Sequence, residues 1–234
     1  MATSKLRGGD LKQRAFELLK SADFEQALEE LCRLPARQVI NPLFSFLYNN
    51  DEQIRWRTVS AMGAVVANLA DKDMEEARVI MRRLMWNLND ESGGIGWGSP
   101  EAMGEILACH EGLAKEYAKI FMSYTMEEGN YLEHEILQRG LLWGIGRLSQ
   151  VRPKLVKDAA TYLIPYLKSP DDTVRGLAAW IMGLLRAEEA RPELEQLTED
   201  ETEVQMYIDR RLTKRRVKKL VDEALERLPV QELS

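Results

Sequence analysis

The segment Val174-RGLAAWIMG-Leu184 decides the fold, because three other segments of the chain align with it without gaps. These segments are Ile54-RWRTVSAMG-Ala64, Ile95-GWGSPEAMG-Glu105 and Leu137-QRGLLWGIG-Arg147. Each of the four contains a Met or Ile followed by glycine, at Gly63, Gly104, Gly146 and Gly183. The glycines therefore recur every 37 to 42 residues. A period near 40 residues with two helices in each unit is typical of an α-solenoid.

Apolar residues recur along nearly the whole chain at the spacing i, i+3, i+4, i+7, and no stretch alternates with a period of two over more than a few residues. Prolines and Asn/Asp/Gly clusters fall between these segments, as expected at helix ends. We therefore predict an all-α fold, an α-α superhelix of stacked helical hairpins without strands. The predicted helices cover residues 10–20, 23–34, 38–49, 52–70, 74–89, 99–109, 114–128, 131–150, 155–168, 171–187, 190–197 and 201–228.

Two of the repeats have similar turn sequences. Leu47-YNNDEQIR-Trp56 and Leu167-KSPDDTVR-Gly176 each lead to a Met-Gly pair. This order resembles HEAT-like repeats of the phycobilisome-lyase type, whose pattern is leucine, a short Asp-containing turn, Val-Arg, small residues and Leu-Gly. The third repeat has Gln138 in place of the arginine, and the second has Gly96. The resemblance covers roughly residues 38–187 and implies a right-handed superhelix with a concave, protein-binding surface, but it does not imply lyase activity.

The flanks of the repeats predict the domain organisation. We expect one domain over residues 1–234, with an N-terminal cap hairpin at 10–37, four repeats at 38–187 and C-terminal cap helices at 188–234. The composition, 45% hydrophobic and 30% charged, is that of a globular protein. No apolar run has the length of about 18 residues that a membrane span needs, and the first residues lack a signal-peptide core, so we expect a cytoplasmic protein. Cys32 and Cys109 are expected to be core thiols.

The helical periodicity also separates core positions from outward positions. One stripe predicts a core of Ile54, Ala61, Met62, Ala102, Met103, Leu141, Ile145, Ala178, Ile181 and Met182. The opposite side of the four repeats carries Trp56, Trp97, Trp143 and Trp180. These indoles either fill gaps between adjacent hairpins or line a groove as apolar surface for a partner. Trp97 and Trp143 are the best candidates for the groove, because their repeats depart most from the pattern.

The second repeat has a longer connection, Trp86-NLNDESGGIGWGSPEAMGEI-Leu107. Ser99-Pro100-Glu101 is a strong helix start, with serine as the cap, so residues 92–98 form a glycine-rich loop that is either a binding site or a hinge. The crowded carboxylates disfavour phosphate and favour a cation, a basic peptide or an amine. The predicted partner-binding residues are Asp90, Glu91, Gly93, Gly94, Trp97, Glu101, Glu105 and Trp143.

Recognisable catalytic motifs are absent from the sequence, including HExxH, CxxC, GxSxG and dinucleotide fingerprints. We therefore expect no cofactor and no metal, and a non-enzymatic scaffold that binds a protein or peptide on its concave face. The alternative is a small-ligand or metal-binding enzyme, lyase-like or glycosylase-like. It would use Asp90, Glu101 and Glu105 below the loop, with His134 as a further metal ligand.

Charge argues against nucleic acid as the partner. The alkylpurine DNA glycosylases, a HEAT-like family, excise bases with Trp and Asp, to which Trp86, Asp90 and Trp97 bear a superficial resemblance. Those enzymes need a basic groove, whereas this chain has a net charge of −6. The basic cluster from Arg210 to Lys219 follows an acidic stretch, 188–203, and we expect the two to pair within the C-terminal cap. A membrane partner is not expected, and the oligomeric state stays open.

Overall fold

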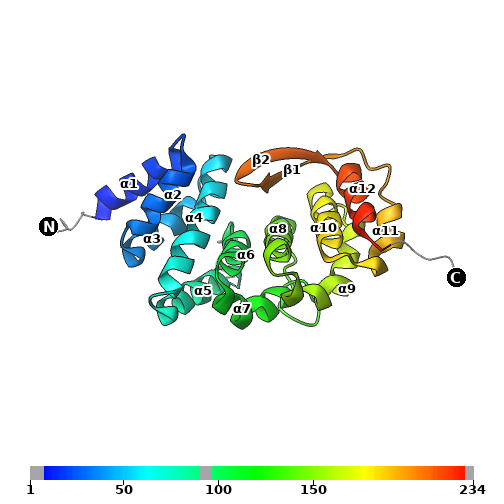
Figure 1. Cartoon of the computed structure of the whole chain (residues 1–234), viewed down its shortest axis with the longest axis horizontal. Coiled ribbons are helices and arrows are strands. Elements are labelled where there is room, and N and C mark those ends of the chain that lie inside the picture. The colour runs from blue at the N-terminus through cyan, green and yellow to red at the C-terminus, as the bar shows by residue number, and fades with distance from the viewer. Residues whose placement is uncertain (1–7, 90–95, 230–234) are drawn as a thin grey trace. The chain divides into compact units, whose positions relative to one another are not determined.

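The computed structural model describes residues 8–89 and 96–229, and Figure 1 shows the order of the elements. The chain divides into two compact units, Met1–His110 and Glu111–Ser234. Both units are mainly α-helical. Over the described residues, no helix combines the length and the apolar character needed to cross a bilayer.

The first unit is built around a central helix, α4. It packs against helices on both sides in the sequence, with contacts to α3, α5 and α6 and weaker ones to α1 and α2. Fully buried Ala61 and Met62 of α4 and Met103 of α6 belong to its core. The described helices of this unit are α1 (Gly8–Lys20), α2 (Phe24–Arg33), α3 (Ala36–Phe46), α4 (Glu52–Ala70), α5 (Met74–Leu88) and α6 (Ser99–Cys109).

The second unit is built around α10, which packs against α8 and α12. Short 3-10 segments, written η, connect its helices. The elements are α7 (Glu111–Ser123), α8 (Glu135–Val151), η1 (Pro153–Leu155), η2 (Lys157–Ala159), α9 (Ala160–Leu163), η3 (Ile164–Lys168), α10 (Asp172–Leu185), η4 (Glu188–Ala190), α11 (Arg191–Glu195), β1 (Glu203–Ile208), β2 (Arg211–Arg216) and α12 (Val217–Arg227). Every core residue predicted from the apolar stripe, in both units, is buried.

The repeat glycines mark places where neighbouring helices leave no room for a side chain. A Cβ at Gly63 of α4 would lie 2.5 Å from Glu105 Cγ of α6. A Cβ at Gly146 of α8 would lie 2.0 Å from the indole ring of Trp180 on α10, and one at Gly183 of α10 would lie 2.8 Å from a backbone atom of α12. Each of these three glycines lies twelve residues after the N-cap of its helix, whereas Gly104, the fourth glycine predicted to be equivalent, lies six residues after the N-cap of α6. Trp180 therefore fills the space between adjacent helices.

An aspartate in the repeat turn starts the next helix. Asp51 accepts hydrogen bonds from the backbone N–H groups of residues 53 and 54 and caps α4, and Asp171 accepts one from Val174 and caps α10. Asp171 also accepts a hydrogen bond of 2.9 Å from Arg139 Nε of α8. Burial alone would raise the pKa of Asp171, but the hydrogen bonds from Arg139 and Val174 outweigh it and hold the pKa below its usual value.

The predicted helix over 201–228 is wrong for residues 203–216, which form a β-hairpin. Strands β1 and β2 pair antiparallel from Glu203↔Arg216 to Ile208↔Arg211. Val204 and Met206 are buried while Glu203 and Gln205 are exposed, and β1 contacts α10. A period of two over so few residues is easily missed beside a basic run that suits a helix face. The helix predicted over 131–150 begins later, at Glu135. The helix predicted over 171–187 begins at Asp172 and ends at Leu185.

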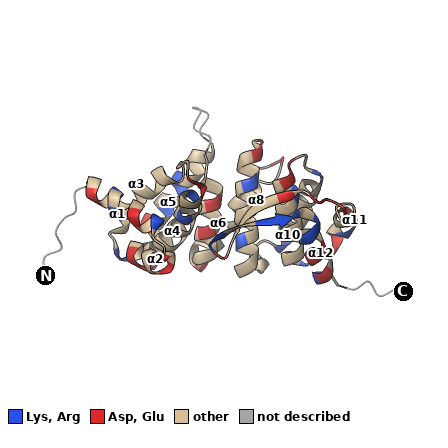
Figure 2. Ribbon diagram, turned by 90° about the horizontal axis from the view of Figure 1, so that it is seen from above, with Lys and Arg blue, Asp and Glu red and all other residues tan. Residues whose placement is uncertain are grey.

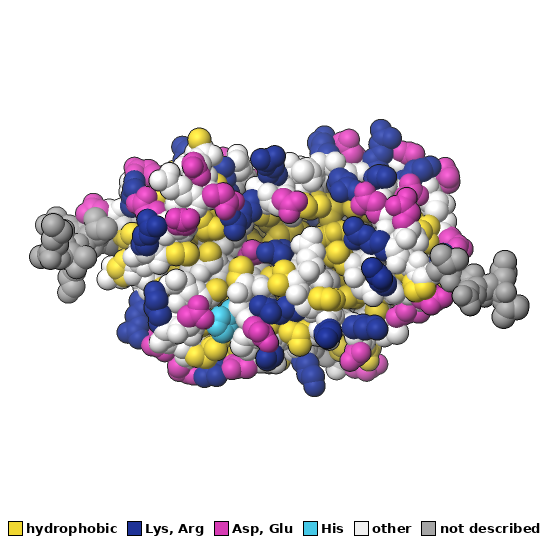
Figure 3. All heavy atoms as spheres, in the orientation of Figure 1, with side chains coloured by type: hydrophobic (Ala, Val, Ile, Leu, Met, Phe, Trp, Pro, Cys, Tyr) yellow, Lys and Arg dark blue, Asp and Glu magenta, His cyan; other side chains and the backbone are white. Residues whose placement is uncertain are grey.

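The hairpin carries much of the basic cluster, and four of the seven basic residues from Arg210 to Lys219 form ion pairs within the C-terminal segment. Figure 2 marks a run of basic residues along the hairpin, and Figure 3 shows lysines and arginines interspersed with aspartates and glutamates on the face drawn. The pairs within the C-terminal segment are Lys214–Glu203, Arg215–Glu223, Arg216–Glu201 and Lys218–Glu199.

Replacing Gly146 with alanine is expected to lower the stability by about 1–3 kcal/mol, because the new Cβ would overlap the Trp180 ring. Thermal denaturation followed by circular dichroism measures the effect, and a loss of this size lowers the melting temperature by several degrees. The control is Gly9→Ala in α1, where nothing lies within 4 Å of a new Cβ, so stability should stay equal or rise slightly. Equal melting temperatures of Gly146→Ala and the original protein would contradict this close approach.

Candidate functional site

The site predicted from the sequence lies in the first unit, where α5 ends at Leu88 and α6 begins at Ser99. Four predicted residues, Asp90, Glu91, Gly93 and Gly94, lie outside the described part of the chain. The late start of α6 is as predicted, but the cap is Gly98, and Ser99 is already helical. Gly98 has φ of 73°, and a Cβ there would lie 3.0 Å from the Leu47 side chain. Glycine is therefore favoured by both conformation and space.

Two tryptophans flank this connection. Trp97 is half-buried, whereas the side chain of Trp86 at the end of α5 is 73% exposed, the highest value among the large apolar side chains described. Gly96 lies against the backbone of Asn87, so the segment that carries Trp97 returns to the end of α5. The sequence contained a usable signal for Trp86, which lies off the buried stripe formed in α5 by Ala77, Ile80, Met81 and Leu84.

Glu101 lies in the first turn of α6, and its Oε2 atom is buried with no hydrogen-bond partner. Burial raises the pKa of the Glu101 carboxyl to about 7, although a hydrogen bond with its own backbone N–H and the charge of Arg55 on α4 both lower it. A buried carboxylate is costly unless it is paired. This group therefore gains or loses a proton near neutral pH, and it can accept a cation or donate a hydrogen bond in its protonated form.

Glu105, one turn after Glu101 on α6, is largely withdrawn from solvent. It is 6% exposed, and its side chain lies against Gly63 of α4. Cys109, one turn later, donates a weak hydrogen bond of 3.7 Å to Glu105 Oε1. The expectation that Cys109 is a core thiol is wrong, since it is exposed, and Cys32 is only half-buried. Glu105 is a helix-packing residue.

Trp143 is not exposed either. It lies in the second unit, where its side chain is 3% exposed and its indole Nε1 donates a hydrogen bond of 2.8 Å to the backbone oxygen of Tyr207 on β1. The ring centroids of Trp143 and Tyr207 are 6.2 Å apart. The hairpin that the sequence did not predict covers this indole, which is why a helical projection placed Trp143 at a surface.

The metal-binding alternative gains no support from the described residues. Within 8–89 and 96–229, no three His, Cys, Asp or Glu side chains converge as metal ligands. His134 precedes α8 and contributes no side-chain cap there. Trp86, Trp97 and Glu101 all belong to the first unit and lie close in sequence to the junction of α5 and α6, where Asn87 of α5 donates a hydrogen bond of 3.5 Å to Ser99 of α6.

The raised pKa of Glu101 predicts a dependence of stability on pH. Because the pKa is higher in the folded than in the unfolded state, stability from the protonated form is fully present below the usual value of 4.5 and is lost as the pH rises through about 7. Glu101→Gln, which resembles the protonated form, should therefore lose less stability between about pH 5 and 8. Urea denaturation across this range measures it. Glu226→Gln, at an exposed position of α12, is the control and should follow the original protein, whereas a Glu101→Gln curve parallel to that of the original protein would contradict the prediction.

Sequence comparison identifies part of the chain. Residues 135–185, which run from α8 to the end of α10, match the HEAT-like repeat family. An uncharacterised protein of Archaeoglobus fulgidus is 29% identical over 118 residues, which make up 50% of this chain and 55% of that protein. The match thus spans about half the length of this relative.

Solved structures resemble the chain over most of its length. A designed armadillo repeat protein in complex with the peptide (KR)4 is 18% identical, with a TM-score of 0.53, over 94% of this chain and 100% of that one. Computationally designed armadillo repeat proteins for modular peptide recognition give 17% identity and a TM-score of 0.50 over the same shares. At such low identity the similarity shows the fold alone. The fold is that of the all-α superhelices, with the β1–β2 hairpin added, and residues 135–185 match the HEAT-like repeat family.

Proposed function

We propose that the protein is a non-enzymatic repeat scaffold that binds a basic segment of a protein or peptide partner at the junction of α5 and α6. The observation that carries the proposal is the exposure of Trp86, 73% at the end of α5. Single exposed apolar residues are common on proteins. Tryptophan, however, is among the residue types most enriched where interfaces concentrate their binding energy, because its large flat ring excludes water from its partner.

Charge supports a basic partner. Glu101 places a carboxyl group in the first turn of α6, and the chain as a whole has a net charge of −6. We include Asp90 and Glu91 of the connection in the same surface, together with Gly93, Gly94 and Trp97. A designed protein of the same fold is in complex with (KR)4, which is a chain of alternating basic residues. Complementary charge speeds encounter and selects partners more than it adds affinity.

The finer assignments from the sequence are part of the proposal. We propose that the repeats are of the phycobilisome-lyase type, on the turns that contain Asp51 and Asp171. We propose a single domain in which caps at 10–37 and 188–234 enclose the four repeats, and a partner surface on the concave side that solenoids commonly use. A cytoplasmic location suits a chain with two thiols that are not paired in a disulfide.

Binding of a fluorescently labelled (KR)4 peptide, measured by anisotropy, tests the proposed surface. Trp86→Ala is expected to weaken binding at least about fivefold, the loss that marks an interface residue of more than 1 kcal/mol. Glu101→Gln should weaken it as well. Val79→Ala is the matched control, since Val79 is 49% exposed on the same helix, two turns earlier.

The measurement also tests the sign of the partner's charge. A peptide of alternating Glu and Asp of the same length should not bind, and the affinity for (KR)4 should fall with added salt. Equal affinities of Trp86→Ala and the original protein would contradict the assignment of the surface. A failure of the original protein to bind (KR)4 would contradict a basic partner.

A further inference from the structure

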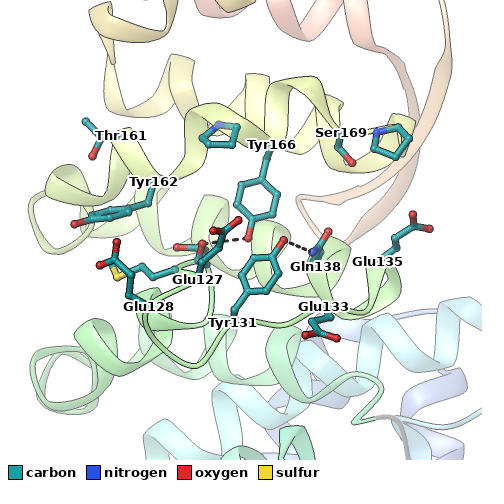
Figure 4. Close-up of a pocket in the computed structure, with 14 residues that line it drawn as sticks. Glu127, Glu128, Tyr131, Glu133, Glu135, Gln138, Thr161, Tyr162, Tyr166 and Ser169 are labelled. Atoms are coloured by element: carbon teal, nitrogen blue, oxygen red, sulfur yellow. Dashed lines mark hydrogen bonds between the residues drawn. The ribbon is translucent and has the colours of Figure 1, made fainter.

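A cavity of about 510 Å³ lies in the second unit, bounded by the segment between α7 and α8 on one side and by α9 and η3 on the other (Figure 4). This volume falls within the range of pockets that bind small molecules. Its lining is marked by tyrosines and glutamates, and all of it belongs to the second unit. The cavity is separate from the surface proposed for the partner.

Tyrosine rings form two sides of the cavity. Tyr131 and Tyr166 point toward one another from opposite walls (Figure 4). The Tyr131 hydroxyl accepts a hydrogen bond of 3.1 Å from Gln138 Nε2, and the Tyr166 hydroxyl donates one of 3.3 Å to the backbone oxygen of Thr125. These bonds hold the two rings in position. Tyr162 adds a third ring, which is 44% exposed.

Tyr166 stays uncharged near neutral pH. Burial raises the pKa of Tyr166, and its neighbours Tyr131 and Glu127 raise it further. A neutral phenol ring presents a negative face, which attracts cations placed over it. Aromatic walls of this kind suit an organic cation with attached methylene groups, because the rings contact both the charge and the hydrocarbon.

The charged residues of the lining are all acidic. The list is Glu127, Glu128, Glu133 and Glu135, and all four are exposed. None of them forms an ion pair with a described residue, and the lining includes no lysine or arginine. Arg139 donates a hydrogen bond to Asp171, which raises the pKa of the Arg139 guanidinium, and the charge of Glu135 raises this pKa further without an ion pair between the two side chains. Among the described residues, the charged side chains that line the cavity are therefore all negative.

A metal ion does not fit this arrangement. Divalent cations need several oxygen ligands that converge to within about 2.0–2.6 Å of one point. Among the described residues, no three carboxylates or histidines converge in that way, here or elsewhere. A larger cation needs no such convergence, because carboxylates spread around it and ring faces can share its charge.

We propose that this cavity binds an alkylammonium group, supplied either by a lysine side chain of a partner or by a free polyamine. The ammonium group lies among the glutamates, and the methylene chain contacts Tyr131, Tyr166 and Pro165. This site goes beyond the proposed scaffold function and does not depend on it, because its residues and its ligands are different.

Isothermal titration calorimetry on the full chain tests the site with three ligands. Nα-acetyl-lysine methylamide and spermidine should bind, and the neutral analogue Nα-acetyl-norleucine methylamide should not. The double variant Glu127→Gln/Glu128→Gln should weaken binding of both cations about tenfold, since two nearby charges are lost. Tyr131→Leu should weaken it about threefold to fivefold through loss of the ring face. Glu226→Gln on α12 is the matched control and should leave both affinities unchanged.

The outcomes separate the possibilities. Tighter binding of the lysine ligand points to a protein partner and tighter binding of spermidine to a free polyamine, and both support the site. Equal binding of the norleucine ligand, unchanged affinity in the double glutamate variant, or no binding of either cation at millimolar concentration would overturn it. The glutamates and Tyr131 are exposed, so the variants should keep the circular dichroism spectrum of the original protein. Trp86→Ala should not change these affinities, so this proposal and the proposed function can fail separately.

Discussion

The absence of a side chain at Gly146 determines how α8 and α10 stack. A helix pair normally keeps its axes apart by the width of the side chains between them. Here the Trp180 ring occupies the position where a Cβ would stand, so the indole reaches the backbone of its neighbour. Gly183 repeats the arrangement against α12, and Gly63 repeats it against α6 in the first unit. Since repeats of this kind gain stability only from their nearest neighbours, each of these contacts supports the elements that pack on it.

The recurrence of these glycines made much of the fold predictable. Spacing near 40 residues located α4, α6, α8 and α10, and helical periodicity found the buried residues of each. Strands β1 and β2 escaped prediction, because Val204 and Met206 alternate over too short a stretch and because pairing with β2 is not encoded in local periodicity. Trp143 was misplaced for the same reason. Its hydrogen-bond partner, Tyr207, lies 64 residues away in the chain, and no helical projection contains such a contact.

The candidate sites show a similar division. Sequence reasoning located the connection between α5 and α6 from its irregularity, and Glu101 from its acidic neighbours. It could not show that packing against α4 withdraws Glu105 from solvent and buries an oxygen of Glu101. The cavity in the second unit was missed entirely, because its walls come from the separate segments predicted as helices over 114–128, 131–150 and 155–168, which only the fold brings together. The density of Glu and Tyr between residues 127 and 135 was the one local indication of it.

Asp171 bears on how repeats of this protein could be exchanged by recombination. The carboxylate that starts α10 is also the one that holds Arg139 of the preceding repeat helix, so a helix start and an inter-helix ion pair share one side chain. A crossover placed between η3 and α10, the conventional repeat boundary, would separate Asp171 from its arginine. It would leave a buried carboxylate without its cation, which is among the more damaging changes in a protein interior. The unit that can be transplanted intact therefore runs from α8 through α10, so that Arg139 and Asp171 stay together.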